Sequence, residues 1–126
     1  MELRTFSRSK KQSVCGAVMA VAALVFPALA HATVVCTGAI GYLGIGLSGD
    51  VVVANGSAIN VICNAVTQGS YQVNPQACKI FYATLLANRL AGRGIAIYYN
   101  DPALTSCSQI TSWSSQPSAY FLEHVN

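Results

Sequence analysis

Residues 51–63 read VVVANGSAINVIC, two apolar runs on either side of a tight-turn signal. Asn55-Gly56 is a strong hairpin signal, because both residue types accept the positive φ values that a two-residue turn requires. We therefore predict strands at 51–54 and 58–63. In a regular strand the second run would place Ile59, Val61 and Cys63 on one face.

The segments on either side of this hairpin extend it to a meander followed by a helix. Apolar residues alternate with glycine over 37–45, which predicts a first strand antiparallel to the hairpin. Downstream, Asn74 can cap a helix that begins at Pro75 and runs to about residue 91. Its four-residue spacing of apolar side chains predicts a stripe that packs against the sheet.

Two later apolar stretches, at 95–99 and 119–124, predict a fourth and a fifth strand. The resulting order is β-β-β-α-β-β, which is the order of an OB-fold barrel. We therefore predict an α+β, mostly β domain, namely a small OB-like five-stranded antiparallel barrel with one helix, stapled by disulfides. Within it we expect three side chains to lie in the core: Phe81, Leu85 and Phe121.

The first thirty-two residues have the three parts of a secretory signal: a basic start, an apolar run and a small-residue exit. Cleavage after Ala30 or after Ala32 would fit the exit, and we favour the second. A membrane anchor is disfavoured because the run is shorter than the roughly 20 apolar residues of a spanning helix and ends at Pro27. We thus predict a signal peptide at 1–32, a single exported domain at 33–126 in the periplasm or outside the cell, and no stable membrane insertion.

Four cysteines follow the predicted cleavage site, an even number that indicates two disulfides in an oxidising compartment. Three pairings are possible. We favour Cys63 with Cys78, which would join a strand end to a helix start, and Cys36 with Cys107, which would join the first strand to a late loop. No C-x-x-C pair occurs and no histidine is close to these residues in sequence, so we predict no metal site.

The basic character of the whole chain comes from its first thirty-two residues. The chain has seven Lys and Arg against four acids, but residues 33–126 hold three of each. Lys79, Arg89 and Arg93 lie on or beside the predicted helix and are best explained as its solvated face. Because nucleic-acid binding needs clustered cations, we predict no nucleic-acid partner.

Few residues suited to catalysis are present after residue 32. The one histidine is His124, next to the end of the chain, and the three acids Asp50, Asp101 and Glu123 are far apart in sequence. Hydrolysis usually needs a nucleophile beside a base, or two carboxylates with a water between them. We therefore predict a protein that is not an enzyme and uses no cofactor.

Binding residues are better represented, chiefly between residues 98 and 113. Sugars are held by an aromatic plate and by amide, carboxylate and hydroxyl groups at its edges. Two alternatives stay open: a tryptophan in a small domain often fills the core, and Asn-Asp-Pro is ordinary turn chemistry. The candidates for ligand binding are Trp113, Tyr98, Asn100, Asp101 and Tyr71.

Two stretches carry a family resemblance: PQACKIFYATLL at 75–86, and IAIYYND at 95–101 followed by Ser106-Cys107 and Trp113. They resemble small secreted proteins of proteobacteria. More distantly, the Cys-bearing strand, the helix with an aromatic-x-x-x-Leu-Leu core and the strand after it look like the OB-fold B subunits of pentameric A-B toxins of the pertussis and subtilase type. That resemblance implies a ring of five identical subunits that binds host-surface glycans. No sugar-contacting residue of those toxins can be matched to a position in this chain.

Three functions follow from these observations, in order of preference. The first is a non-catalytic exported domain that binds a glycan or a host-surface protein, alone or as a homo-oligomer. The second is an envelope-associated structural or inhibitory protein that contacts another protein through a strand edge or a helix face. A small hydrolase ranks last, for want of catalytic residues.

Overall fold

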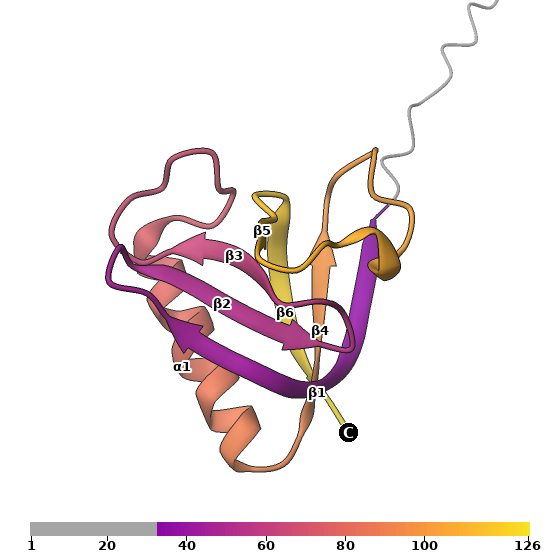
Figure 1. Cartoon of the computed structure of the whole chain (residues 1–126). Helices are drawn as coiled ribbons and strands as arrows, with labels where there is room; N and C mark the ends of the chain where they lie inside the picture. Colours follow the sequence, from indigo (N-terminus) through magenta and orange to yellow (C-terminus); the bar gives the residue numbers. More distant parts are fainter. Residues whose placement is uncertain (1–32) are drawn as a thin grey trace, which may run out of the picture.

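A computed structural model describes residues 33–126, in which one helix packs against a six-stranded mixed sheet (Figure 1). The predicted signal peptide, 1–32, lies outside the described residues. The helix is α1 (Pro75–Leu90), and a short 3-10 turn, η1, covers Cys107–Gln109. The strands are β1 (Val34–Ile45), β2 (Asp50–Asn55), β3 (Asn60–Asn64), β4 (Gly94–Tyr99), β5 (Ser114–Ser115) and β6 (Ala119–Val125).

The sheet is organised around the long, bent strand β1 (Figure 1). Its first half pairs with β4 and its second half with β2, so the strand order is β5-β3-β2-β1-β4-β6. All pairs are antiparallel except β3 with β5. The two edge strands, β5 and β6, are consecutive in the chain. The segment between them is hydrogen-bonded to both halves of the sheet: Gln116 N donates to the Val61 carbonyl oxygen of β3, and Asn100 N, directly after β4, donates to the Ser118 carbonyl oxygen.

The predicted order of strands and helix is present, but a closed five-stranded antiparallel barrel is not confirmed. The sheet has a sixth strand, β5, and one parallel pair. Strand β5 is two residues long and lies in a polar segment, so it lacks the alternating apolar pattern by which a strand is recognised in sequence.

The Asn55-Gly56 turn lies where predicted and packs directly on β1. A Cβ at Gly56 would lie 2.7 Å from the Thr37 carbonyl oxygen, so only glycine fits there, and its φ is 76°. The two-residue turn predicted from the sequence requires a positive φ at both Asn55 and Gly56, but the φ of Asn55 is not positive. Its buried side chain donates from Nδ2 to the Cys36 carbonyl oxygen at 2.6 Å and anchors the turn to the middle of the fold.

Helix α1 begins with the predicted cap. Asn74 Oδ1 accepts a hydrogen bond from Ala77 N at 2.9 Å, and Pro75 occupies the first turn. The helix contacts β1, β3 and β4, and Leu85 is fully buried in the core that it shares with these strands. No helix among residues 33–126 has both the length and the apolar character needed to cross a membrane.

Both predicted disulfides are present. Cys36–Cys107 joins β1 to η1 with a Cα–Cα distance of 5.6 Å, and Cys63–Cys78 joins β3 to the first turn of α1 at 5.7 Å. Two disulfides in so small a fold fit an oxidising environment of the kind that an exported protein meets.

Two details of strand orientation were predicted wrongly, and each has a β-bulge as its cause. The register of β3 shifts against β2 between Val51 and Val52, so that Ile62 and Cys63 are both fully buried and the predicted alternation is lost. The register of β6 shifts against β4, and Phe121, which we expected in the core, is 48% exposed. The other two expected core residues behave as predicted: Leu85 is buried and Phe81 packs against the core.

The first residue of β2, next to the turn from β1, carries a carboxylate that two side chains hold. Asp50 Oδ2 accepts from Ser48 Oγ at 2.5 Å, and Oδ1 accepts from Asn64 Nδ2 at 2.8 Å. Asn64 Oδ1 in turn accepts from the backbone N–H groups of Val66 and Thr67. The hydrogen bonds that Asp50 accepts, first the one from Ser48 and then the one from Asn64, lower its pKa below the ordinary value.

We expect this carboxylate to make the fold less stable in acid. The folded pKa lies below that of an unfolded aspartate, about 3.9, so its stabilising contribution is complete above that pH and is lost as the pH falls through the folded value. Urea unfolding at a series of pH values should show a shallower acid loss for Asp50→Asn. Ser48→Ala, which removes the largest cause of the shift, should move the profile in the same direction. Identical profiles for both variants and the native chain would contradict this assignment.

Candidate functional site

The tryptophan that follows η1 is held on the surface in an unusual backbone conformation. Trp113 is 62% exposed and does not fill the core. Among residues 33–126 it is the non-glycine residue with a positive φ, 62°, a region that bulky side chains rarely occupy. Its backbone N–H donates to the Ile59 carbonyl oxygen at 2.6 Å. Backbone strain of this kind persists only where the surrounding structure imposes it, and it is frequent at functional sites.

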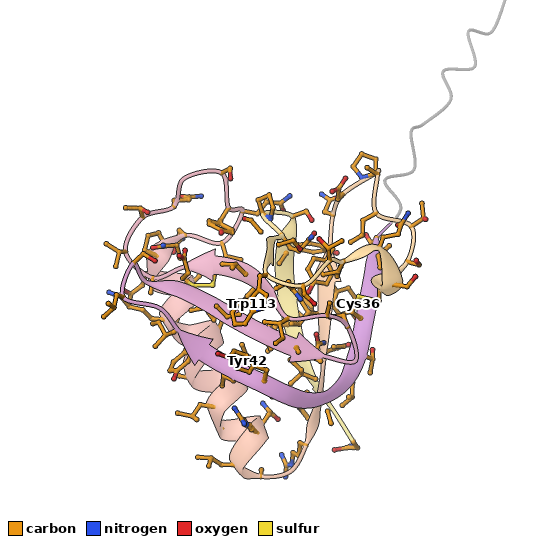
Figure 2. The ribbon with its side chains drawn as sticks, viewed as in Figure 1. Cys36, Tyr42 and Trp113 are labelled. Atoms are coloured by element: carbon orange, nitrogen blue, oxygen red, sulfur yellow. A yellow bond between two sulfur atoms is a disulfide. The ribbon has the colours of Figure 1, made fainter. Side chains whose placement is uncertain are left out.

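The ring of Tyr42, on β1, packs against Trp113 on the surface of the sheet. The ring centroids of Tyr42 and Trp113 are 5.8 Å apart, with planes at 75°. Figure 2 shows both side chains on the same side of the ribbon, Trp113 near β3 and β2 and Tyr42 on β1. The Tyr42 ring also lies over Gly44, where an added Cβ would come 3.4 Å from its ring atoms. Two residues far apart in sequence thus form one exposed aromatic pair.

The strand register places an apolar floor beside this pair. Gly44, Val52, Val61 and Ser115 follow one another across four neighbouring strands. Val52 lies between two residues of the core, so its side chain is on the opposite face of β2, yet it is only 9% exposed. We call this surface the aromatic platform. It consists of Tyr42, Val52, Val61, Trp113 and Ser115.

Hydroxyl groups border the platform at β5. Ser115 Oγ donates to Tyr71 Oη at 2.9 Å. Tyr71 and Trp113, both candidates from the sequence, are therefore brought to the same short strand. The platform combines ring surface with hydrogen-bonding groups at its border, which is the combination that a sugar needs.

The candidates Asn100 and Asp101 have local structural contacts. Asp101 Oδ1 accepts from the backbone N–H of Ala103 at 2.8 Å, which is the ordinary turn chemistry of an Asn-Asp-Pro sequence. The backbone N–H of Asn100 donates to the Ser118 carbonyl oxygen at 2.9 Å and fixes the loop to the start of β6. Their contacts in the described residues are thus within the loop and with the chain before β6, and not with the platform.

The remaining candidate, Tyr98, belongs to a different group of side chains on β4 and β6. Its ring centroid is 6.3 Å from that of Tyr120 and 5.2 Å from that of Phe121. Its hydroxyl donates to Glu123 Oε1 at 2.6 Å, and this hydrogen bond is the main reason why the pKa of Tyr98 is raised. We call these four residues the β6 aromatic cluster. The five candidates from the sequence therefore do not form one site.

Sequence reasoning missed Tyr42, Tyr120 and Phe121 as surface residues. Tyr42 has a signal in hindsight, because a tyrosine in a glycine-rich strand has few large neighbours on its own strand to pack against. The exposure of Tyr120 and Phe121 depends on the bulge in β6, which no sequence signal marked.

Within residues 33–126 no enclosed pocket is found, and no group of three His, Cys, Asp or Glu side chains is placed to hold a metal ion. The chain matches no protein-family model, no curated protein and no solved structure.

Proposed function

We propose that this chain is an exported, non-catalytic binding protein whose aromatic platform takes a carbohydrate. The observation that carries the proposal is the exposure of Trp113. Its large ring is 62% exposed, its backbone is strained, and the ring of Tyr42 packs against it. Leaving so much apolar surface in water costs free energy that burial would recover, about 25 cal/mol for each Å². A ligand with an apolar face, such as a pyranose ring, would cover this surface.

The hydroxyl border supports a sugar rather than a wholly apolar ligand. Ser115 and Tyr71 already exchange a hydrogen bond at the end of the platform, and the net charge of residues 33–126 is zero, from three basic and three acidic residues. A neutral surface with an aromatic plate and hydroxyl groups suits a neutral glycan. It offers no cluster of cations for a phosphate or sulfate group.

We expect Trp113→Gly to weaken glycan binding strongly without loss of the fold. Glycine accepts φ of 62° without strain, so the variant removes the ring and keeps the backbone path. A central tryptophan contact is worth about 2 kcal/mol or more, so binding should fall by about thirtyfold. The measurement is a glycan array followed by titration calorimetry with the best ligand.

The matched control for this experiment is Phe121→Ala, which removes an exposed ring from the other aromatic group. It should leave glycan affinity unchanged. Binding that survives Trp113→Gly, while unfolding curves show an intact fold, would place the glycan elsewhere. A loss of binding in Phe121→Ala and not in Trp113→Gly would move the site to β6.

We further propose that the sheet is an OB-like barrel that is only partly closed. Support comes from the continuity of β5 and β6 at opposite sheet edges, and from α1 between β3 and β4. Because the chain resembles the B subunits of pentameric toxins, we also propose that five copies of it form a ring. Native mass spectrometry of the exported protein distinguishes five subunits from one.

A second candidate function is binding of an envelope or host-surface protein, as a structural or inhibitory partner. One observation favours it: α1 exposes apolar side chains, with Ile80 59% and Leu90 80% exposed. Such a surface fits contact with another protein. This candidate would be favoured if the chain bound no glycan and if Ile80→Glu, but not Trp113→Gly, abolished binding of a protein partner.

A further inference from the structure

The β6 aromatic cluster contains three rings close together on the face of the sheet opposite the core. Tyr98 is flanked by Tyr120 and Phe121, with planes inclined at 70° and 77° to its own. Rings so inclined meet edge to face and cannot cover one another as a parallel stack would. Tyr120 and Phe121 stay 41% and 48% exposed.

The bulge in β6 is what brings the two flanking rings to the same surface. Ala119 pairs with Tyr99 and Phe121 pairs with Tyr98, so Tyr120 is the extra residue in the ladder. In a regular strand two successive side chains would point to opposite faces. Here Tyr120 and Phe121 are both exposed and both contact Tyr98.

A carboxylate lies at the tip of the central ring. Glu123 Oε1 accepts from the Tyr98 hydroxyl at 2.6 Å, and Glu123 is itself exposed. The three strands on this side, β1, β4 and β6, hold no Lys or Arg, and the basic residues of 33–126 lie on α1 or directly after it. Besides Tyr120 and Glu123, the titratable residue of β6 is His124. It faces Ile95 in the register, whereas Glu123 faces Ala96, so His124 and Glu123 project to opposite faces of a regular strand.

We propose that the β6 aromatic cluster binds an organic cation of the quaternary ammonium type. The faces of aromatic rings carry negative charge from the ring quadrupole and attract such cations, and Tyr120 and Phe121 are both partly exposed to solvent from which a cation can approach. The carboxylate of Glu123 adds a full negative charge beside the rings. A neutral ligand would use the rings alone, whereas a cation uses both features.

The test is an NMR titration of the exported domain with tetramethylammonium and choline, with 3,3-dimethylbutanol as the neutral control of the same shape. Each ring contact with an exposed cation contributes up to about fivefold in affinity. We expect saturable shifts at the ring protons of Tyr98, Tyr120 and Phe121 for the cations. The neutral alcohol should bind at least about fivefold more weakly, because it lacks the charge.

Two variants test the assignment. Phe121→Ala should lower the affinity for the cation by about fivefold. Glu123→Gln, which keeps the size of the side chain and its acceptor oxygen but removes the charge, should lower this affinity by about threefold. Trp113→Gly should leave cation binding unchanged, which separates this site from the proposed glycan site. Equal affinity for the alcohol, shifts at Tyr42 and Trp113 instead, or the lack of any saturable shift would each overturn the proposal.

The quaternary ammonium group could belong to a small solute or to a lipid headgroup. Choline and phosphatidylcholine vesicles distinguish these sources. Binding to vesicles that is lost in Phe121→Ala identifies a headgroup, and binding to choline alone identifies a free solute. Either result supports the cation site, whereas vesicle binding that persists in Phe121→Ala counts against it.

Discussion

Replacing both Cys36 and Cys107 with alanine is expected to lower the free energy of unfolding by about 4 kcal/mol, the largest effect of any change considered for this chain. This bridge spans 71 residues, so the unfolded chain gains considerable conformational entropy when it is removed. Since small proteins are stable by only about 5–15 kcal/mol, the variant should unfold at much lower urea concentration. Equilibrium unfolding followed by circular dichroism measures the change.

The second disulfide provides the matched comparison. Cys63–Cys78 spans 15 residues, and by the same loop-entropy relation its removal should cost about 3 kcal/mol. Alanine is the replacement of choice because Cys36, Cys63 and Cys78 are fully buried, where a serine hydroxyl would need a new partner. A loss below about 1 kcal/mol for the longer bridge would mean that the chain between β1 and η1 is held by packing alone.

Leu85→Ala is expected to lower the free energy of unfolding by about 3 kcal/mol, because it leaves a cavity where α1 meets the sheet. Leu85 is fully buried and belongs to the same core as Ile95 and Ile97 of β4. Chemical unfolding of the purified variant measures the loss.

Leu90→Ala is the control for this prediction, as the same substitution on the same helix at a site that is 80% exposed. A surface change of this kind should alter stability by no more than about 0.5 kcal/mol. If the two variants were equally destabilised, the face of α1 that packs on the sheet would have been assigned wrongly.

The success and the failure of the sequence-based predictions have a common cause, namely the distance over which a pattern acts. The cap at Asn74, the proline after it and the turn at Gly56 act within a few residues, and all three lie where predicted. The errors at Phe121 and Ile62 come from bulges. A bulge depends on how two strands match across the sheet, and the alternation within one strand does not reveal it.

The candidate site illustrates the same limit. The type of Trp113 and its polar surroundings indicate a binding residue, but a tryptophan in a small domain more often fills the core, and nothing in the sequence pairs Trp113 with Tyr42. They meet because β1, β2, β3 and β5 lie side by side in that order. The sequence groups Tyr98 with Trp113 because both belong to one stretch, whereas the ring contacts of Tyr98 are with Tyr120 and Phe121 of β6.

The amino-acid sequence by itself determined the order of the main strands and the helix and the zero net charge of residues 33–126, and it favoured, among three possible pairings, the two disulfides that the structure contains. These follow from local backbone preferences, from cysteine spacing and from simple counting. Only the tertiary structure decided the sixth strand, the exposure of Trp113 and Phe121 and the separation of two aromatic groups. The physical reason is that strand register is set jointly by segments distant in sequence, and register decides which side chains share a face.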